Sequence, residues 1–491
     1  MLRPQREITA AQLAAGQKEL VRELAWSSLS GAFAGGVILV ACALTLGATP
    51  LHVGLLASIP FLAQALQLPA TVLVERLQLR RRIAVLSLTA ARLIVLGMAL
   101  LPLLPHRGAL AALLTAQMLV CSFNAVGSCA LNSWLHQLIP PAQLGTFFAR
   151  RLFSGTTVSC LGTLVAGLFI DRWWTGDRLH GHALGFALAG LAGFVSSALV
   201  ARAPEPVMTR AGPAAPMRER LLEPFADDNF RRLLLFLASW TVVSNLAAPF
   251  LTVYLIRQRG YPLGTVTALW VAGQMANALT LYLWGRLSDR FSNKNVLAAA
   301  LPVYFVCLLA VTFFNLVDSA RVQIVLLAVI HVVMGAASGG IGLATGNLGL
   351  KLAPQGRGTA YLAAIGLVSA VAGGIAPLAG GSLAETLQAN ELLAVIRWTA
   401  PGSSGEVEVL KFAHWEFVFG LAALLGLYVL HALSRVREAG ESSDRRVMQE
   451  FAMEAVRAVG NATTSIGGLL FPFERLSERR QWWRARQARR S

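Results

Sequence analysis

The stretch that decides the fold is Trp284-Gly-Arg-Leu-Ser-Asp-Arg-Phe-Ser-Asn-Lys294. It places four charged residues, Arg286, Asp289, Arg290 and Lys294, within eleven positions and directly after a long hydrophobic run. Basic residues at the end of an apolar segment are typical of a loop at the inner face of a membrane. The rest of the chain decides whether this stretch is such a loop.

The composition indicates a membrane protein. Of the 491 residues, 55% are hydrophobic and only 14% are charged, and the mean hydropathy is +0.59. A soluble domain carries about 25% charged residues, so this chain has too few charges to keep its apolar surface in water. A bilayer removes the conflict, because each spanning helix needs about 20 apolar residues.

Twelve apolar runs are long enough to cross a bilayer. We place them at roughly 26–48, 51–74, 83–105, 109–138, 152–170, 182–202, 232–256, 262–284, 295–315, 322–347, 359–384 and 413–434. Backbone polar groups cannot stay unpaired in lipid, so these runs must be helices. The N-terminal region has no short apolar core with a small-residue cleavage site, so we expect no removable signal peptide.

The Lys and Arg residues predict the orientation. With the N-terminus in the cytoplasm, 33 of the 42 fall on the inner side and eight on the outer side. Cytoplasmic loops favour Lys and Arg, so we expect a multi-pass protein of the inner (plasma) membrane with both termini cytoplasmic. The net charge of +17 then reflects topology and a basic tail. It does not indicate nucleic acid, because no recognition motif accompanies it.

Two short matches indicate an internal duplication. Gly285–Arg290 follows the eighth run, and Thr71-Val-Leu-Val-Glu75-Arg76 follows the second run, 214 positions earlier. A second pair, Pro141–Phe148 and Pro354–Tyr361, has an offset of 213. Transporters are often built from such repeats; chance similarity of loop chemistry is the alternative. We therefore expect an N-terminal segment (1–25), a six-helix bundle (26–202), a cytoplasmic linker (203–231), a second six-helix bundle (232–434) and a basic cytoplasmic tail (435–491).

On these residues the chain resembles the major facilitator superfamily, whose loops after the second and eighth helices carry G-x-L-x-D-R-x-G-R-K. Gly285, Leu287, Asp289, Arg290 and Lys294 match, whereas Ser292 and Asn293 depart from the pattern. The first-half copy has Thr71 for the glycine and Glu75 for the aspartate. The resemblance implies an all-α fold of two six-helix bundles related by pseudo-twofold symmetry, and it specifies no substrate.

The charged stretch predicts a conformational latch. Gly285 permits close helix contact, and Asp289 can face the positive N-terminal end of a neighbouring helix. Such contacts exist only while the inner helix ends are packed together, so they favour one of two conformations. We assign the latch to Gly285, Asp289 and Arg290, with Glu75 and Arg76 as the first-half copy. The alternative is that the charges only fix topology, which leaves Asp289 unexplained.

Polar residues at mid-membrane are candidates for solute binding. The resemblance implies that the first, fourth, seventh and tenth helices border a central cavity, and these helices carry Asn124, Asn245 and His331. The pairs Gln64–Gln67 and Gln274–Asn277 have a spacing of three, which puts each pair on one helix face. Either pair could bind a polar solute or join helices to each other. His331 suits proton coupling because its unperturbed pKa is near 6.5, but a histidine that bonds between helices is the more frequent case.

Other polar and reactive residues give weaker signals. Arg92 lies in the third run, where it could bind an anion, pair with a neighbouring helix or snorkel to the surface. No Asp or Glu lies deep within a predicted span, which gives little support to carboxylate-driven proton exchange. The five cysteines all fall in predicted spans and form no C-x-x-C pair, so we interpret them as free thiols. We expect neither a metal nor a cofactor.

Two peripheral segments extend the helical plan. The stretch from Leu393 to Trp398, a Pro-Gly-Ser-Ser-Gly turn and Glu406–Leu410 predict a small extracellular β-hairpin. The tail carries Trp482-Trp483 among many Arg, a pattern that suits anionic lipids at the inner membrane surface; a disordered basic tail is the alternative.

The sequence therefore predicts a secondary active or facilitative transporter that moves a small organic solute by alternating access, acting as a monomer. The alternative is a non-transporting relative that assists the assembly of another membrane complex. A membrane enzyme is disfavoured, because the chain has no G-x-S-x-G or H-E-x-x-H motif.

Overall fold

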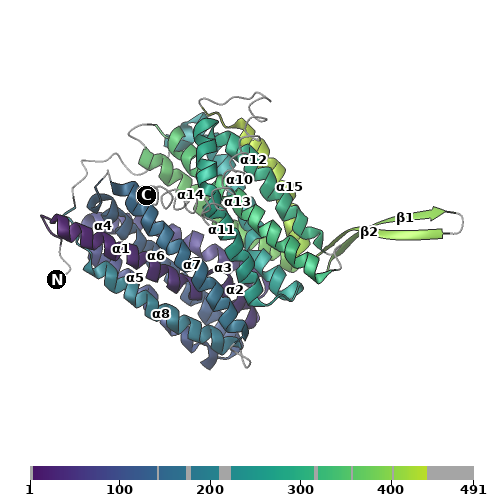
Figure 1. Cartoon of the computed structure of the whole chain (residues 1–491), viewed down its shortest axis with the longest axis horizontal. Helices are drawn as coiled ribbons and strands as arrows, with labels where there is room; N and C mark the ends of the chain where they lie inside the picture. Colours follow the sequence, from purple (N-terminus) through teal and green to yellow (C-terminus); the bar gives the residue numbers. More distant parts are fainter. Residues whose placement is uncertain are drawn as a thin grey trace, which may run out of the picture.

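A computed structural model describes residues 4–140, 143–172, 178–208, 223–314, 319–354, 358–400 and 403–438. Within them, 12 helical segments are long and apolar enough to cross a membrane. They form two bundles that lie side by side (Figure 1). The predicted all-α plan of two six-helix bundles is therefore confirmed. The predicted lipid-binding tail lies outside the described residues, which end at Glu438.

The first bundle contains six spans, three of which are broken into shorter pieces. Its helices are α1 (Ala10–Ala34), α2 (Gly36–Thr45), α3 (Pro50–Gln64), α4 (Gln67–Leu77), α5 (Arg80–Gly97) with the 3₁₀ turn η1 (Met98–Leu103), α6 (His106–Leu138), α7 (Leu144–Arg172) and α8 (Arg178–Arg202). The break between α1 and α2 is at Gly35, and Gly36, the first residue of α2, has a φ of +50° that suits a residue without a side chain.

The second bundle also contains six spans. Its helices are α10 (Asp228–Val253) with the π-helical turn η3 (Tyr254–Gln258), α11 (Leu263–Arg290), α12 (Asn293–Thr312), α13 (Ala320–Leu352), α14 (Gly358–Thr386) and α15 (Trp415–Arg435). Glycines permit its tightest contact, which joins α11 to α13. A Cβ on Gly335 would overlap the carbonyl oxygen of Gly273, and one on Gly339 would lie 2.9 Å from the carbonyl oxygen of Asn277.

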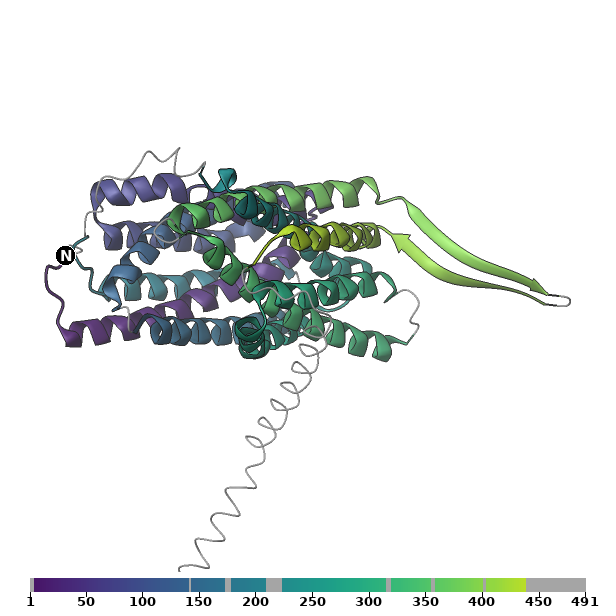
Figure 2. The same cartoon turned by 90° about the horizontal axis from the view of Figure 1, so that it is seen from above.

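A two-stranded hairpin, β1 (Glu391–Ala400) and β2 (Ser403–Ala413), connects α14 to α15. The strands are antiparallel, with Leu392 opposite Phe412 and an irregularity between Ala394 and Val395. The hairpin is present where the sequence predicted it, and it is longer at both ends. It projects well beyond the helices (Figure 2). We call these helix ends the hairpin side, and the opposite ends, where residues 203–227 join α8 to α10, the linker side.

The two bundles pack together most closely on the hairpin side. There α3 lies against α14, and a Cβ on Gly54 would overlap the carbonyl oxygen of Pro377. The helices α7 and α11 form a second contact, in which Gly167 lies under the side chain of Thr267. On the linker side, by contrast, α4 packs mainly on α6 and α5 of its own bundle. The interface between the bundles therefore tightens toward the hairpin.

Candidate solute cavity and its gates

A cavity of about 460 Å³ lies between the two bundles. Its wall comes from α2, α3 and α6 of the first bundle and from α10, η3, α11, α12 and α13 of the second. Gly36, directly after the helix break, borders the cavity, and so do Thr252, just before the π-helical turn, and Leu255 within it. Irregular backbone in membrane proteins is tolerated where it lines such a cavity. The volume falls in the range of 300–1,000 Å³ that is typical of small-molecule sites.

The polar groups of the cavity are few and uncharged. They belong to Gln117, Thr252, Gln274, Tyr304, His331 and Ser338. The remainder of the wall is apolar and includes the ring of Trp270. Within the described part of the chain, no Asp, Glu, Lys or Arg lines the cavity. Because a buried ion needs an opposite charge or a dense set of hydrogen bonds, this wall suits a neutral solute with apolar surface.

His331 lies in the cavity wall and is held by its own helix. Its Nδ1 is 2.8 Å from the carbonyl oxygen of Leu327. A carbonyl only accepts, so Nδ1 carries a proton in this arrangement. The other ring nitrogen, Nε2, is then the one that can accept a proton or a hydrogen bond from a solute.

The hairpin side of the cavity is closed by polar contacts between the bundles. Thr49 Oγ1 and the backbone N–H of Leu51 both donate to Glu385 Oε2, each at 3.1 Å. Arg257 of the second bundle donates to the carbonyl oxygen of Leu44 at 3.3 Å. The backbone N–H of Gly264 donates to Asp171, which ties the start of α11 to the end of α7.

A second cavity, of about 530 Å³, separates α3 and α4 from α14. It shares Pro60 with the central cavity and extends toward the linker side through Gln64, Gln67 and Thr71. The bundles are therefore less closely packed on the linker side, where this space opens beside the central cavity.

The predicted latch residues lie on the linker side. Asp289 and Arg290 are exposed at the end of α11, and Glu75 and Arg76 are exposed at the end of α4. Asp289 makes no hydrogen bond or ion pair with a described residue, and the guanidinium of Arg290 lies 5.3 Å from the ring centre of Phe291. A Cβ on Gly285 would meet nothing within 4 Å. Among the described residues, no hydrogen bond or ion pair of Asp289, Glu75 or Arg76 joins the bundles in this conformation.

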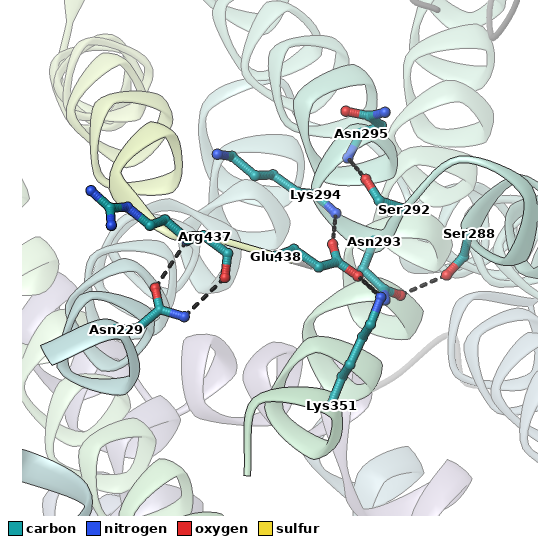
Figure 3. A network of polar contacts seen from close by, with 9 residues as sticks. All are labelled: Asn229, Ser288, Ser292, Asn293, Lys294, Asn295, Lys351, Arg437 and Glu438. Atoms are coloured by element: carbon teal, nitrogen blue, oxygen red, sulfur yellow. Dashed lines mark hydrogen bonds and ion pairs between the residues drawn. The ribbon is translucent and has the colours of Figure 1, made fainter. Parts of the chain in front are cut away.

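Asn293 and Lys294, at the end of the stretch from Trp284 to Lys294, instead bind Glu438, a carboxylate that follows α15. Glu438 accepts from Asn293 Nδ2 and from the backbone N–H of Lys294, each at 2.9 Å, and from Lys351 Nζ at 2.8 Å (Figure 3). Ser288 Oγ donates to Asn293 Oδ1 at 2.6 Å. The side chain of Glu438 is fully buried. This network joins α11, α12, α13 and the segment after α15.

The first bundle has a counterpart at Glu205, which follows α8. Arg80 at the start of α5 lies 3.8 Å from Glu205, and both side chains are almost completely buried. Arg80 also donates to the carbonyl oxygen of Pro206 at 2.7 Å, and Arg81 to that of Ala203 at 3.0 Å. In each bundle, the acidic residue that follows the last helix is thus bound to the start of the third membrane span, which is α5 in the first bundle and α12 in the second.

The two carboxylates have opposite pKa shifts. Burial raises the pKa of Glu438, but hydrogen bonds from Lys351, Lys294 and Asn293 outweigh burial and hold it below its usual value. Burial also raises the pKa of Glu205, and the charges and hydrogen bonds of Arg80 and Arg81 only partly offset it, so this pKa stays above its usual value. The number and geometry of the donors explain the difference.

The sequence model of the Major Facilitator Superfamily matches residues 24–377. The chain belongs to this superfamily. A curated relative, an MFS-type transporter of Aspergillus terreus (strain NIH 2624 / FGSC A1156), is 30% identical over 122 residues, which are 25% of this chain and 21% of that protein. The chain therefore matches about a fifth of the length of that relative.

Solved structures show the same superfamily fold. A mutant of the nucleoside transporter NupG superimposes with a TM-score of 0.67 at 13% identity, over 86% of this chain and 100% of that one. A bacterial homologue of the human lysosomal transporter Spinster, inward-facing and unoccupied, gives 0.59 at 16% identity, over 93% and 97%. The D-xylose-proton symporter gives 0.58 at 14% identity, over 88% and 99%.

Only two of the predicted solute-site residues line the central cavity of this superfamily member, namely Gln274 and His331. Asn277, one turn beyond Gln274, faces α13, because a Cβ on Gly339 would lie 3.2 Å from its Oδ1. Asn245 donates within its own helix to the carbonyl oxygen of Thr241 at 2.9 Å. Gln67 donates to Gln64, and the pair lines the second cavity.

Asn124 is not among the residues that line the central cavity; Gln117, two turns earlier on α6, is. Nothing in the residue pattern favoured Gln117 over Asn124, because both amides lie in the same apolar run. The position of the cavity along α6 decides which of the two amides lines it, and only the structure shows that position.

A buried charged cluster also lies inside the first bundle. Arg151 donates to Glu23 at 2.8 Å and Ser196 donates to its other oxygen at 3.1 Å. Arg92 donates to Ser27 at 2.9 Å, so it pairs with a neighbouring helix. Glu23 escaped notice because the first span was expected to begin at residue 26, whereas α1 begins at Ala10.

Proposed function

We propose that this superfamily member transports a small, uncharged organic solute by alternating access. The observation that carries the proposal is an uncharged, largely apolar cavity between two bundles whose polar contacts with each other lie on the hairpin side. Solute sites at the interface of structural repeats are the rule in transporters. The alternative role in complex assembly needs no such cavity.

The orientation belongs to the same proposal. The Lys and Arg distribution puts the linker side in the cytoplasm, in the plasma or inner membrane. The conformation is then inward-facing, and the contacts of Glu385, Arg257 and Asp171 form its outer gate. In the opposite state we expect these contacts to break and Asp289 to bind across the linker side.

In the proposed mechanism the residues of the cavity wall bind and orient the solute. Gln117, Gln274 and Ser338 orient the solute by hydrogen bonds, and Trp270 covers an apolar face of it. His331 lines the cavity and its Nε2 is the ring nitrogen that can accept a proton, so it is the residue that we assign to proton coupling. Transport changes no covalent bond, so no catalytic residue is required.

The first test screens purified protein for thermal stabilisation by neutral, anionic and cationic solutes at two pH values. A ligand that binds the folded state stabilises it by mass action. We expect neutral solutes alone to stabilise the protein, and the best of them to cross the membrane of proteoliposomes. Stabilisation by charged solutes only, or by none, would refute transport of a neutral solute and favour the assembly role.

The second test compares matched amides. Gln117→Ala and Gln274→Ala each remove one cavity hydrogen bond and should lower the apparent affinity about fivefold, as a net loss of roughly 1 kcal/mol predicts. Asn245→Ala is the control, because its amide bonds its own helix and does not line the cavity. His331→Ala should abolish any pH dependence of binding; an unchanged pH profile would remove the proton-coupling role.

A further inference from the structure

A groove that follows α1 and α7 changes from basic to apolar along its length. At the linker side, a cavity of about 630 Å³ is lined by Lys18 and Arg22 of α1 and Arg150 of α7. Farther along, a groove of about 580 Å³ is lined by Trp26 and Leu29 of α1, Leu161 of α7 and Leu188 of α8. We call the first the basic mouth and the second the apolar groove.

The basic mouth and the apolar groove lie on one face of the helix pair. On α1, the lining residues Lys18, Arg22, Trp26, Leu29 and Phe33 recur every three or four positions. On α7, Thr146, Arg150, Val158, Leu161 and Val165 recur at multiples of the same spacing. Residues at this spacing follow one side of a helix. One ligand can therefore extend from the mouth into the groove.

The mouth retains positive charge. Lys18 and Arg150 make no ion pair with a described residue, and Arg22 lies 3.5 Å from Glu19. Among the described residues, Glu19 is the carboxylate that forms an ion pair with one of the three cations, so Lys18 and Arg150 are left without an ion-pair partner there. Gln17 and Gln143, which hydrogen-bond each other at 2.8 Å, add neutral polar groups to the wall.

The boundary between mouth and groove coincides with the expected membrane surface. On α1 the apolar run begins at Trp26, one turn after Arg22, and on α7 it begins at Leu152, directly after Arg150 and Arg151. Trp26 is 40% exposed, and tryptophan is enriched at membrane–water interfaces. The cations thus lie at headgroup level, and the apolar groove lies at acyl-chain level.

We infer that the α1–α7 groove is a binding site for one anionic phospholipid of the linker-side leaflet. Lys18, Arg22 and Arg150 bind the phosphate, and one acyl chain lies along Trp26, Leu29 and Leu161. Basic pockets between membrane helices bind anionic headgroups by the same electrostatics. The site involves neither the central cavity nor the predicted basic tail, so it holds whatever solute the protein carries.

The experiment titrates the detergent-purified full chain with phosphatidylglycerol and with phosphatidylcholine, and counts bound lipid by native mass spectrometry. We expect phosphatidylglycerol to bind at least ten times more tightly than phosphatidylcholine. The triple variant Lys18→Ala, Arg22→Ala, Arg150→Ala should lose about 100-fold in affinity for phosphatidylglycerol, at about fivefold for each cation. Its affinity for phosphatidylcholine, whose choline group already balances the phosphate charge, should fall much less.

The matched control removes three exposed cations elsewhere, as Arg6→Ala, Arg82→Ala, Arg321→Ala. It should change the affinity for phosphatidylglycerol less than twofold. A second variant, Leu161→Trp, fills the apolar groove and should weaken the binding of phosphatidylglycerol. Equal loss in both triple variants, or displacement of the lipid by millimolar phosphate alone, would overturn the inference.

Discussion

Replacement of Glu438 by glutamine should release the segment after α15 from the second bundle. The carboxylate is fully buried and accepts three hydrogen bonds, two of them from Lys351 and the backbone N–H of Lys294. A hydrogen bond to a charged group contributes about 1.5–3 kcal/mol. Glutamine keeps the shape but turns one acceptor into a donor, which then opposes the donors around it.

The amide of Lys294 reports this loss directly. It donates to Glu438 Oε2 at the start of α12, so its hydrogen exchange depends on that bond. A loss of about 1.5–3 kcal/mol corresponds to exchange roughly 10–150 times faster, since 1.36 kcal/mol is a factor of ten. The measurement is peptide-resolved hydrogen–deuterium exchange over residues 292–298, and the start of α5 in the first bundle is the internal control.

The direction of the pKa shift of Glu438 predicts how the protection of the Lys294 amide changes with pH. The pKa of Glu438 is lowered in the folded protein, so its contribution is present above the unfolded value of about 4.3 and is lost as the pH falls through the folded value. Protection of Lys294 should therefore persist to about pH 5, fall in more acidic solution, and show no such step in Glu438→Gln. Equal protection in wild type and variant at pH 7 would refute this account of the network.

Three further predictions concern other sites. Glu205→Gln should show the opposite pH trend, because the raised pKa of Glu205 makes its stabilisation largest at low pH and smaller as the pH rises; melting curves of wild type and variant should diverge between pH 4 and 7, and parallel curves would contradict this. Gly335→Val should destabilise the second bundle by about 2 kcal/mol through overlap with Gly273, whereas Gly342→Ala, with open space around it, should be neutral by the same unfolding assay. If the protein alternates access as proposed, Asp289→Asn should leave the conformation described above intact and lower the population of the opposite one, measured by accessibility of a single cysteine in the cavity; an unchanged balance would remove the latch.

Hydropathy and repetition were sufficient to predict the helical plan. The spans depend on local composition, and a bilayer imposes the same helical answer on every apolar run. The largest boundary error is at the first span, where α1 begins at Ala10. Polar residues such as Lys18 and Arg22 lowered the hydropathy there, although packing on α7 and α8 keeps the segment helical.

The site was less predictable, because depth along a helix does not say which way a side chain points. Gln274 and Asn277 share a helix and a spacing of three, yet one lines the cavity and the other faces α13. The ion pairs Arg80–Glu205 and Lys351–Glu438 were also missed, because their partners are far apart in the sequence and only the packing of the helices brings them together. One available signal was overlooked: Glu205 follows Arg202 by three positions, as Glu438 follows Arg435.

The hairpin gives the second bundle a long lever arm. Its base is fixed to α15, since Phe412 lies over Gly420 and contacts the ring of Phe417. Ten residues of strand extend about 33 Å. A tilt of the bundle by about 10° would therefore move the tip through roughly 6 Å, so that a dye placed there would report tilting of the second bundle from beyond the helix ends.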